Sequence, residues 1–209
     1  MTCMVRFFRH SVCLALAILL TGCAFGTRQA TLVYPPAGKS LAKVGAPAEA
    51  KPEARETKVL LVQFRDERSD KSVVGTVRNG FGMRTADVVS TNDISDWVTK
   101  SLRSELQARG LSVVSEAPPA SADARSVTVS GEILNVFCDM YMSYTGQVSL
   151  VVRVSGKDGE IFNKHYAGEG SAGLAVAATG ESYAQSLALA LSVALKKFVA
   201  DLETGLAGR

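Results

Sequence analysis

The amino-acid sequence predicts a two-layer α+β domain, with a mixed sheet of about five strands in the order β-α-β-β-β-β-α and two helices on one face. Three observations lead to this prediction. A short apolar run is followed by an amphipathic helical pattern and a second apolar run. Three segments of largely alternating polarity come next, and a long stretch rich in alanine and leucine lies near the end of the chain.

The first three elements predict a parallel crossover. Val59–Phe64 (VLLVQF) is apolar without alternation, which indicates a strand covered on both faces. Asn92 or Asp93 is placed to cap a helix that ends at Gly110, and Leu111–Ser115 reads as the next strand. The apolar side chains on one face of this helix are Ile94, Trp97, Val98, Leu102 and Leu106. Strand, helix and strand in this order favour a right-handed parallel connection.

The middle of the domain reads as a three-stranded antiparallel meander. Ser126–Tyr141 begins with clean alternation and then places apolar residues on both parities, which predicts a bulge near Asn135. Tyr144–Val154 alternates well. The Asp-Gly pair at 158–159 predicts a tight turn into a last strand over Glu160–Gly168.

The segment Glu181–Glu203 contains SLALALSVAL, which alternates like a strand. We nevertheless predict a helix, because alanine and leucine are strong helix formers and about 23 residues pass without a breaker. Lys196 and Lys197 interrupt the apolar run, so the helix is not expected to span a membrane. The small residues of Gly168–Glu181 fit a close connection between strand and helix, or the approach of a partner strand or glycan.

The amino terminus predicts export from the cytoplasm. Arg6 and Arg9 precede an apolar run of about ten residues, Ser11–Leu20, and small residues follow. This three-part pattern is typical of a bacterial signal peptide. The run is too short to cross a bilayer, which requires about 20 apolar residues. We therefore predict that residues 1–22 form a signal peptide.

Leu20, Thr21, Gly22 and Cys23 resemble the lipobox of bacterial lipoproteins. The resemblance implies that the Cys23 sulfur carries a diacylglyceryl group, that cleavage follows Gly22, and that a further fatty acid such as palmitate acylates the new amino terminus. Two or more acyl chains anchor a protein stably, whereas one chain binds only marginally. The alternative is an ordinary signal peptide that happens to contain a cysteine.

The residue after the lipobox cysteine bears on the final membrane. Ala24 occupies this position, and in enterobacterial sorting a residue other than Asp there favours transfer to the outer membrane. We expect lipid anchoring at the outer membrane, with the domain on the periplasmic face. Cys3 and Cys13 leave with the signal and Cys23 is alkylated, so Cys138 remains as a thiol and no disulfide is expected.

The remaining chain divides into a tether, residues 23–57, and a single periplasmic domain, residues 58–209. The tether after Cys23 is rich in alanine and proline and spans at most roughly 110 Å, with an average near 30 Å as a flexible coil. Four of the six prolines of the chain lie in it: Pro35, Pro36, Pro47 and Pro52.

Charge and chemistry exclude several classes of function. The chain has 23 basic and 20 acidic residues, and removal of Arg6 and Arg9 leaves 21 against 20, so nucleic-acid binding is not expected. His165 is the only histidine outside the signal, which gives a catalytic triad little support. Cys138 reads as a buried apolar residue. We expect no cofactor, and no metal because no set of residues has ligand spacing.

Three stretches resemble the YajG-like family of Gram-negative envelope lipoproteins, namely QFRDERSDKS, VVGTVRNGFGMRTADV and DISDWVTKSLRSELQARGLSVV. The resemblance covers the lipobox and most of Lys58–Val114. It implies the fold and the envelope location, and it carries over no catalytic residue. The proline-rich tether is longer than in the shorter members of that family.

The segment Arg65–Thr91 is the candidate partner-binding loop, because a structureless loop of this length is uncommon and often functional. Its glycines do not form a phosphate-binding motif. The alternative is a hairpin or covering flap whose acids and bases pair with one another. Trp97 is expected in the core, although a sugar-stacking role is the alternative. The candidate binding residues are Arg68, Lys71, Arg78, Asn79, Arg84 and Asp87.

The sequence thus favours a non-enzymatic lipoprotein that binds another component of the envelope, a protein or the cell wall, from its membrane anchor. A regulatory or auxiliary subunit of a cell-wall synthase or export machine is the second hypothesis, and it rests on the shared architecture of anchor, tether and small domain. A hydrolase that depends on His165 is the third.

Overall fold

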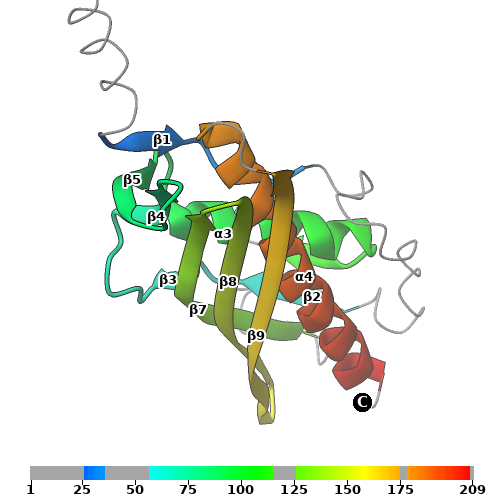
Figure 1. Cartoon of the computed structure of the whole chain (residues 1–209). Helices are drawn as coiled ribbons and strands as arrows, with labels where there is room; N and C mark the ends of the chain where they lie inside the picture. Colours follow the sequence, from blue (N-terminus) through cyan, green and yellow to red (C-terminus); the bar gives the residue numbers. More distant parts are fainter. Residues whose placement is uncertain (1–25, 36–56, 115–125, 175–177, 208–209) are drawn as a thin grey trace, which may run out of the picture.

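The computed structural model describes residues 26–35, 57–114, 126–174 and 178–207, and in this part of the chain nine strands form one mixed sheet. Three long strands pass in front of both helices, which therefore cover one face (Figure 1). The α+β prediction is confirmed. The elements are β1 (Arg28–Ala30), β2 (Lys58–Leu61), β3 (Arg65–Asp66), β4 (Val73–Arg78), β5 (Arg84–Ser90), α3 (Ile94–Ala108), β6 (Ser112–Val114), β7 (Ser126–Met140), β8 (Ser143–Gly156), β9 (Gly159–Leu174) and α4 (Gly180–Ala207).

Strand β7 is the central strand of the sheet. Along one edge it pairs in parallel with β2, β3 and β4 in succession, and along the other edge it pairs with β8 in antiparallel fashion. Beyond β4 the sheet continues through antiparallel β5 to parallel β1. On the far side, β9 pairs with β8. A single long strand thus joins the two halves of the sheet.

Several predicted elements are confirmed. Asp93 caps α3 by accepting a hydrogen bond from the backbone of Asp96, and Gly110 follows the helix with a φ of 80°. Strands β2 and β6 pair in parallel on either side of α3 in the chain. The register of β7 against β8 shifts between Ile133 and Asn135, where the bulge was predicted. Trp97 is buried in the core, as the apolar stripe of α3 indicates.

The prediction of about five strands is wrong, because four further strands are present. Strands β3, β4 and β5 lie in the segment expected to be a loop, and β1 lies in the segment expected to be a tether. Strand β9 also continues to Leu174, although the prediction ended it at Gly168. β1 and β3 have only three and two residues, so neither is long enough to show alternation in the sequence. Their pairing with distant strands defines them.

Helix α4 lies directly on the backbone of β8 and β9, where three glycines allow the close approach. A Cβ atom at Gly146 would lie 2.6 Å from the Ser186 carbonyl oxygen, and one at Gly168 would lie 2.0 Å from that of Ala190. At Gly170 it would meet the Ser186 carbonyl oxygen at 2.6 Å. The helix carries the largest share of the buried core, with 14 buried residues between Tyr183 and Leu206. Neither helix of the described part is long and apolar enough to cross a membrane.

We predict that Gly168→Ala lowers the free energy of unfolding by about 2 kcal/mol, because the added methyl group overpacks the contact with the α4 backbone. Gly80→Ala is the matched control. A Cβ atom there meets nothing within 4 Å, so its effect should stay within about 0.5 kcal/mol. Urea unfolding of the purified protein, followed by the fluorescence of the single tryptophan, measures both. Equal midpoints for the two variants would contradict the prediction.

Candidate functional site

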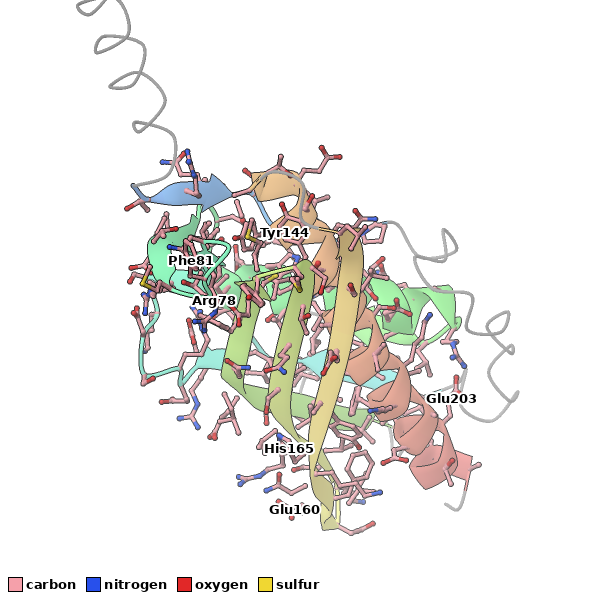
Figure 2. All side chains as sticks on the ribbon, in the orientation of Figure 1. Arg78, Phe81, Tyr144, Glu160, His165 and Glu203 are labelled. Carbon is pink, nitrogen blue, oxygen red and sulfur yellow. The ribbon has the colours of Figure 1, made fainter. Side chains whose placement is uncertain are left out.

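Most of the segment predicted as a loop is the β4–β5 hairpin, which projects from one end of the sheet. Figure 2 shows Arg78 and Phe81 at this end and Glu160 at the opposite end. The Asn79 side-chain oxygen accepts hydrogen bonds from the backbone N–H groups of Phe81 and Met83, each at 3.0 Å. Gly82 has a φ of 80°, which suits glycine in this turn. The turn is therefore closed by its own hydrogen bonds.

The charged side chains of the hairpin pair within the protein. Arg78 donates from Nε to Asp139 at 2.8 Å and from Nη1 to the Gly82 carbonyl at 3.0 Å. Arg84 forms an ion pair with Asp87. The structure thus shows the hairpin and the paired charges of the alternative interpretation of this segment. The pair between Arg78 and Asp139 fixes the hairpin to β7.

Arg68 has a structural role. Its guanidinium is buried and donates to both carboxylate oxygens of Asp66, each at 2.9 Å, and to the carbonyls of Lys71 and Val73. Burial by itself raises the pKa of the Asp66 carboxyl, but the hydrogen bonds from Arg68 outweigh burial and lower it. Arg68 is therefore not on an exposed binding surface, whereas the Lys71 side chain is exposed.

The hairpin and the neighbouring β7–β8 turn together expose a group of large apolar side chains. The Tyr141 hydroxyl donates to the Gly80 carbonyl at 3.4 Å, which brings the two turns together. Leu174, at the end of β9, pairs with Ser143 beside the β7–β8 turn. Of the eight exposed large apolar side chains of the described residues, five belong to this group, the apolar tip: Phe81 (89% exposed), Met83 (59%), Tyr141 (45%), Met142 (71%) and Leu174 (81%).

A shallow hollow of about 450 Å³ adjoins the apolar tip on the sheet face that the helices leave uncovered. Its floor combines apolar, hydroxyl and amide groups, and the Asp139 carboxylate is already engaged by Arg78. The hollow extends the exposed surface of the tip along β7 and β8. Its lining residues are Phe137, Asp139, Tyr141, Met142, Ser143, Thr145 and Gln147.

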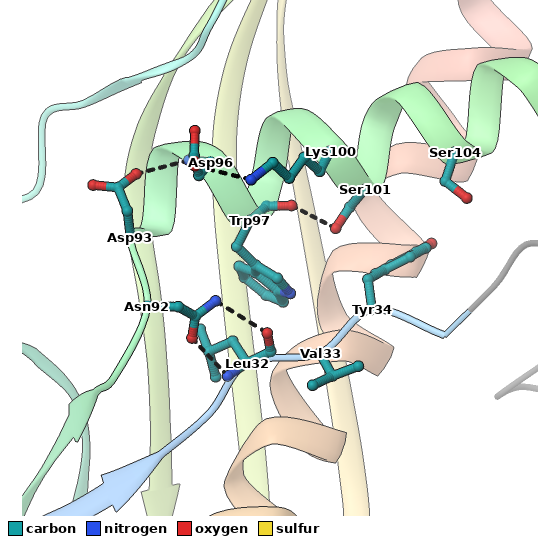
Figure 3. A pocket seen from close by; sticks show the side chains of 10 residues that line it. All are labelled: Leu32, Val33, Tyr34, Asn92, Asp93, Asp96, Trp97, Lys100, Ser101 and Ser104. Atoms are coloured by element: carbon teal, nitrogen blue, oxygen red, sulfur yellow. Dashed lines mark hydrogen bonds and ion pairs between the residues drawn. The ribbon is translucent and has the colours of Figure 1, made fainter.

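A second pocket, of about 320 Å³, lies between the segment after β1 and the start of α3 (Figure 3). Asn92 accepts a hydrogen bond from the backbone of Leu32 at 2.8 Å and donates to its carbonyl at 3.1 Å. Tyr34 donates to Glu105 of α3. These polar groups hold the segment after β1 against the domain, so we assign this pocket a structural role.

The groups considered for catalysis line neither of the two pockets described above. His165 is exposed on the uncovered sheet face, and its Nε2 lies 2.6 Å from the Ser149 hydroxyl. Cys138 is a buried free thiol, as the sequence predicts, and burial raises its pKa to about 12. Among the described residues, no group of three or more histidine, cysteine or carboxylate side chains is arranged to hold a metal ion.

Fold and surface together define a two-layer α+β domain with an exposed apolar tip at one end. Residues 46–204 match the family described as "Uncharacterized lipoprotein", and the chain belongs to this family. The match spans most of the domain and supports the lipoprotein prediction. The narrower resemblance to YajG-like proteins remains a prediction. No curated protein shows detectable sequence similarity to the chain.

Solved structures share the fold. Protein XCC0632 from Xanthomonas campestris superposes with a TM-score of 0.53 at 10% identity, over 86% of this chain and 95% of that protein. The hypothetical protein CT253 from Chlamydia trachomatis gives a TM-score of 0.50 at 10% identity, over 74% of this chain and 100% of that protein. At these identities the similarity establishes the fold alone.

We predict that Arg68→Ala lowers the free energy of unfolding at neutral pH by about 3 kcal/mol, because it leaves the Asp66 carboxylate without its partner. Lys71→Ala removes an exposed side chain nearby and should change the free energy of unfolding by no more than about 0.5 kcal/mol. Urea unfolding of both variants measures the difference.

The ion pair between Arg68 and Asp66 also predicts that the free energy of unfolding depends on pH. The pKa of Asp66 is lowered in the folded protein, so the stabilisation is present above the ordinary value of 3.8 and is lost as the pH falls through the folded value. The difference between wild type and Arg68→Ala should therefore shrink below about pH 4. A difference that stayed constant from pH 7 to pH 3 would contradict the assigned role of Asp66.

Proposed function

We propose that this lipoprotein is anchored through Cys23 at the periplasmic face of the outer membrane and acts without enzymatic activity as a binding module of the envelope. The family supports the lipoprotein class. The signal pattern, the lipobox residues Leu20, Thr21 and Gly22, and the resemblance to YajG-like proteins support the anchor and its location.

The observation that carries the binding role is the apolar tip. Soluble proteins seldom gather large exposed apolar side chains in one place, and such groups mark surfaces that contact a protein or a membrane. The tip is also fixed in shape, because Asn79 closes its turn and Arg78 ties it to β7. A surface that is ordered before binding loses less conformational entropy when a partner covers it.

The polar and charged residues predicted from the sequence stabilise the hairpin that carries this surface. Arg78, Asn79, Arg84 and Asp87 hold the hairpin through bonds within the protein. Because these charges are paired, recognition would depend on apolar contact more than on net charge. Phe81 and Met83 would contact the partner, in place of the charged residues that the sequence predicts for this contact.

The second hypothesis, an auxiliary subunit of a synthase or export machine, would use the same tip on a protein partner. A target on the far side of the periplasm would also require a long tether between the anchor and the sheet. Strand β1 begins at Arg28, only five residues after Cys23, so the fold favours a partner close to the anchoring membrane. The hydrolase hypothesis gains a hydrogen bond between His165 and Ser149, but both lie on an open sheet face.

Photo-crosslinking in intact cells tests the proposal. A benzophenone amino acid at Phe81 should give specific adducts with an envelope component, whereas the same group at Lys157 should not. Lys157 is a matched control because it is exposed in the β8–β9 turn, at the opposite end of β8. Equal crosslinking at both positions, or none at Phe81, would contradict a binding role for the apolar tip.

A further inference from the structure

We propose that the surface bound by the apolar tip is the lipid surface of the membrane that holds the anchor. The inference rests on the proposed function, since it takes Cys23 as the lipidated residue and the apolar tip as the contact surface. The position of β1 in the sheet points to the membrane as the partner of that surface.

The register of β1 directs the anchor toward the hairpin. Arg28 pairs with Val88 of β5, and the two strands run in parallel. Strand β5 begins at Arg84, immediately after the tip residue Met83. Followed toward the amino terminus, β1 and β5 therefore lead to the same end of the sheet, which is the end where Met83 lies. The anchored end of the chain thus leaves the sheet on the side of the apolar tip.

Chain length limits how far the domain can stand from the membrane. Five residue steps separate Cys23 from Arg28, which span at most about 17 Å. Five steps of β5 separate Val88 from Met83, which is also about 17 Å. A fully extended connection would thus bring Cys23 level with the tip. A shorter path would bring the membrane closer to the domain.

Strand β1, to which this connection leads, is secured to the domain. Ala30 and Leu32 are buried, the Ala30 carbonyl accepts from the backbone N–H of Thr91 at 3.0 Å, and Asn92 holds Leu32 through both of its backbone groups (Figure 3). Removing β1 from the sheet would expose this apolar surface and break these bonds. The residues between Pro35 and Thr57 come after β1, so their length does not increase the distance from the anchor.

The chemistry of the tip suits a bilayer interface. Phe81, Met142 and Leu174 are among the most exposed side chains of the tip, and each is apolar. Tyr141 carries an apolar ring with a polar hydroxyl, a combination that is enriched at membrane interfaces. The neighbouring arginines are paired, so apolar insertion to a depth of about 5–10 Å does not require an unpaired charge to enter. The short connection also keeps the effective concentration of the tip at the bilayer high.

The test uses the full lipidated protein in vesicles of phosphatidylethanolamine and phosphatidylglycerol. An environment-sensitive fluorophore is attached to cysteine in the variants Phe81→Cys and Met142→Cys, with Lys157→Cys as the control. Native Cys138 is buried, so labelling is directed to the introduced residue. We expect brominated lipids to quench the probe at positions 81 and 142 at least threefold and to leave position 157 unchanged. Quenching at position 157 equal to that at position 81 would overturn the inference.

A second variant tests the connection itself. Twenty flexible residues inserted after Ala24 lengthen the five-residue connection to about 25, which lowers the effective concentration of the tip at the bilayer roughly tenfold. Quenching at position 81 should then fall, and quenching that stays the same would overturn the role of the short connection.

The two proposals fail separately. Protein adducts from position 81 in cells, without lipid quenching in vesicles, would overturn the lipid inference and leave the binding function intact. Absence of both adducts and quenching would overturn the binding function as well. Lipid adducts together with quenching support both proposals.

Discussion

The close contact of α4 with the glycines of β8 and β9 is the constraint on which the arrangement of the molecule depends. Because Gly146 and Gly168 have no side chain, the backbone of α4 lies directly on the sheet, and the core side chains of the helix reach the neighbouring strands. Tyr183 of α4 donates to the Thr76 carbonyl of β4 at 3.0 Å, and its ring lies against Gly75. The helix therefore also sets the position of β4, and with it the hairpin and the apolar tip.

The sequence is informative wherever an element is long enough to repeat its own pattern. The stripe of α3, the bulge near Asn135 and the helical nature of α4 could all be predicted, because each follows from local periodicity or propensity. Strand β1 could not be predicted in this way. Its three residues carry no periodic signal. They form a strand because they pair in parallel with the edge of β5 and because Asn92 binds the backbone of Leu32, two residues after the strand. Such pairing is a property of the tertiary structure.

The sequence places the candidate surface in Arg65–Thr91, whereas the proposed apolar tip takes only Phe81 and Met83 from this segment. The length of Arg65–Thr91 marks it as the candidate loop, but most of its charged side chains are paired within the protein, as Arg68 shows most clearly. The signal that could have identified the tip is the presence of Phe81 and Met83 beside glycines in a turn, where polar residues are usual. The contribution of Tyr141 and Leu174 depends on strand pairing, so it could be seen only in the fold.

The position of β1 changes the physical meaning of the alanine- and proline-rich segment. A flexible tether of about 34 residues would separate the anchor from the domain by about 30 Å on average and would leave the orientation of the domain free. In the structure, β1 and β2 belong to the same sheet, so the residues between them connect two strands of one sheet. With the anchor at Cys23, as proposed, the orientation of the domain at the membrane would be governed by the few residues before Arg28 and by the surface beside them. For a lipid-anchored protein, a short connection restricts which face meets the bilayer, and an apolar tip on that side lowers the free energy of this one orientation relative to the others.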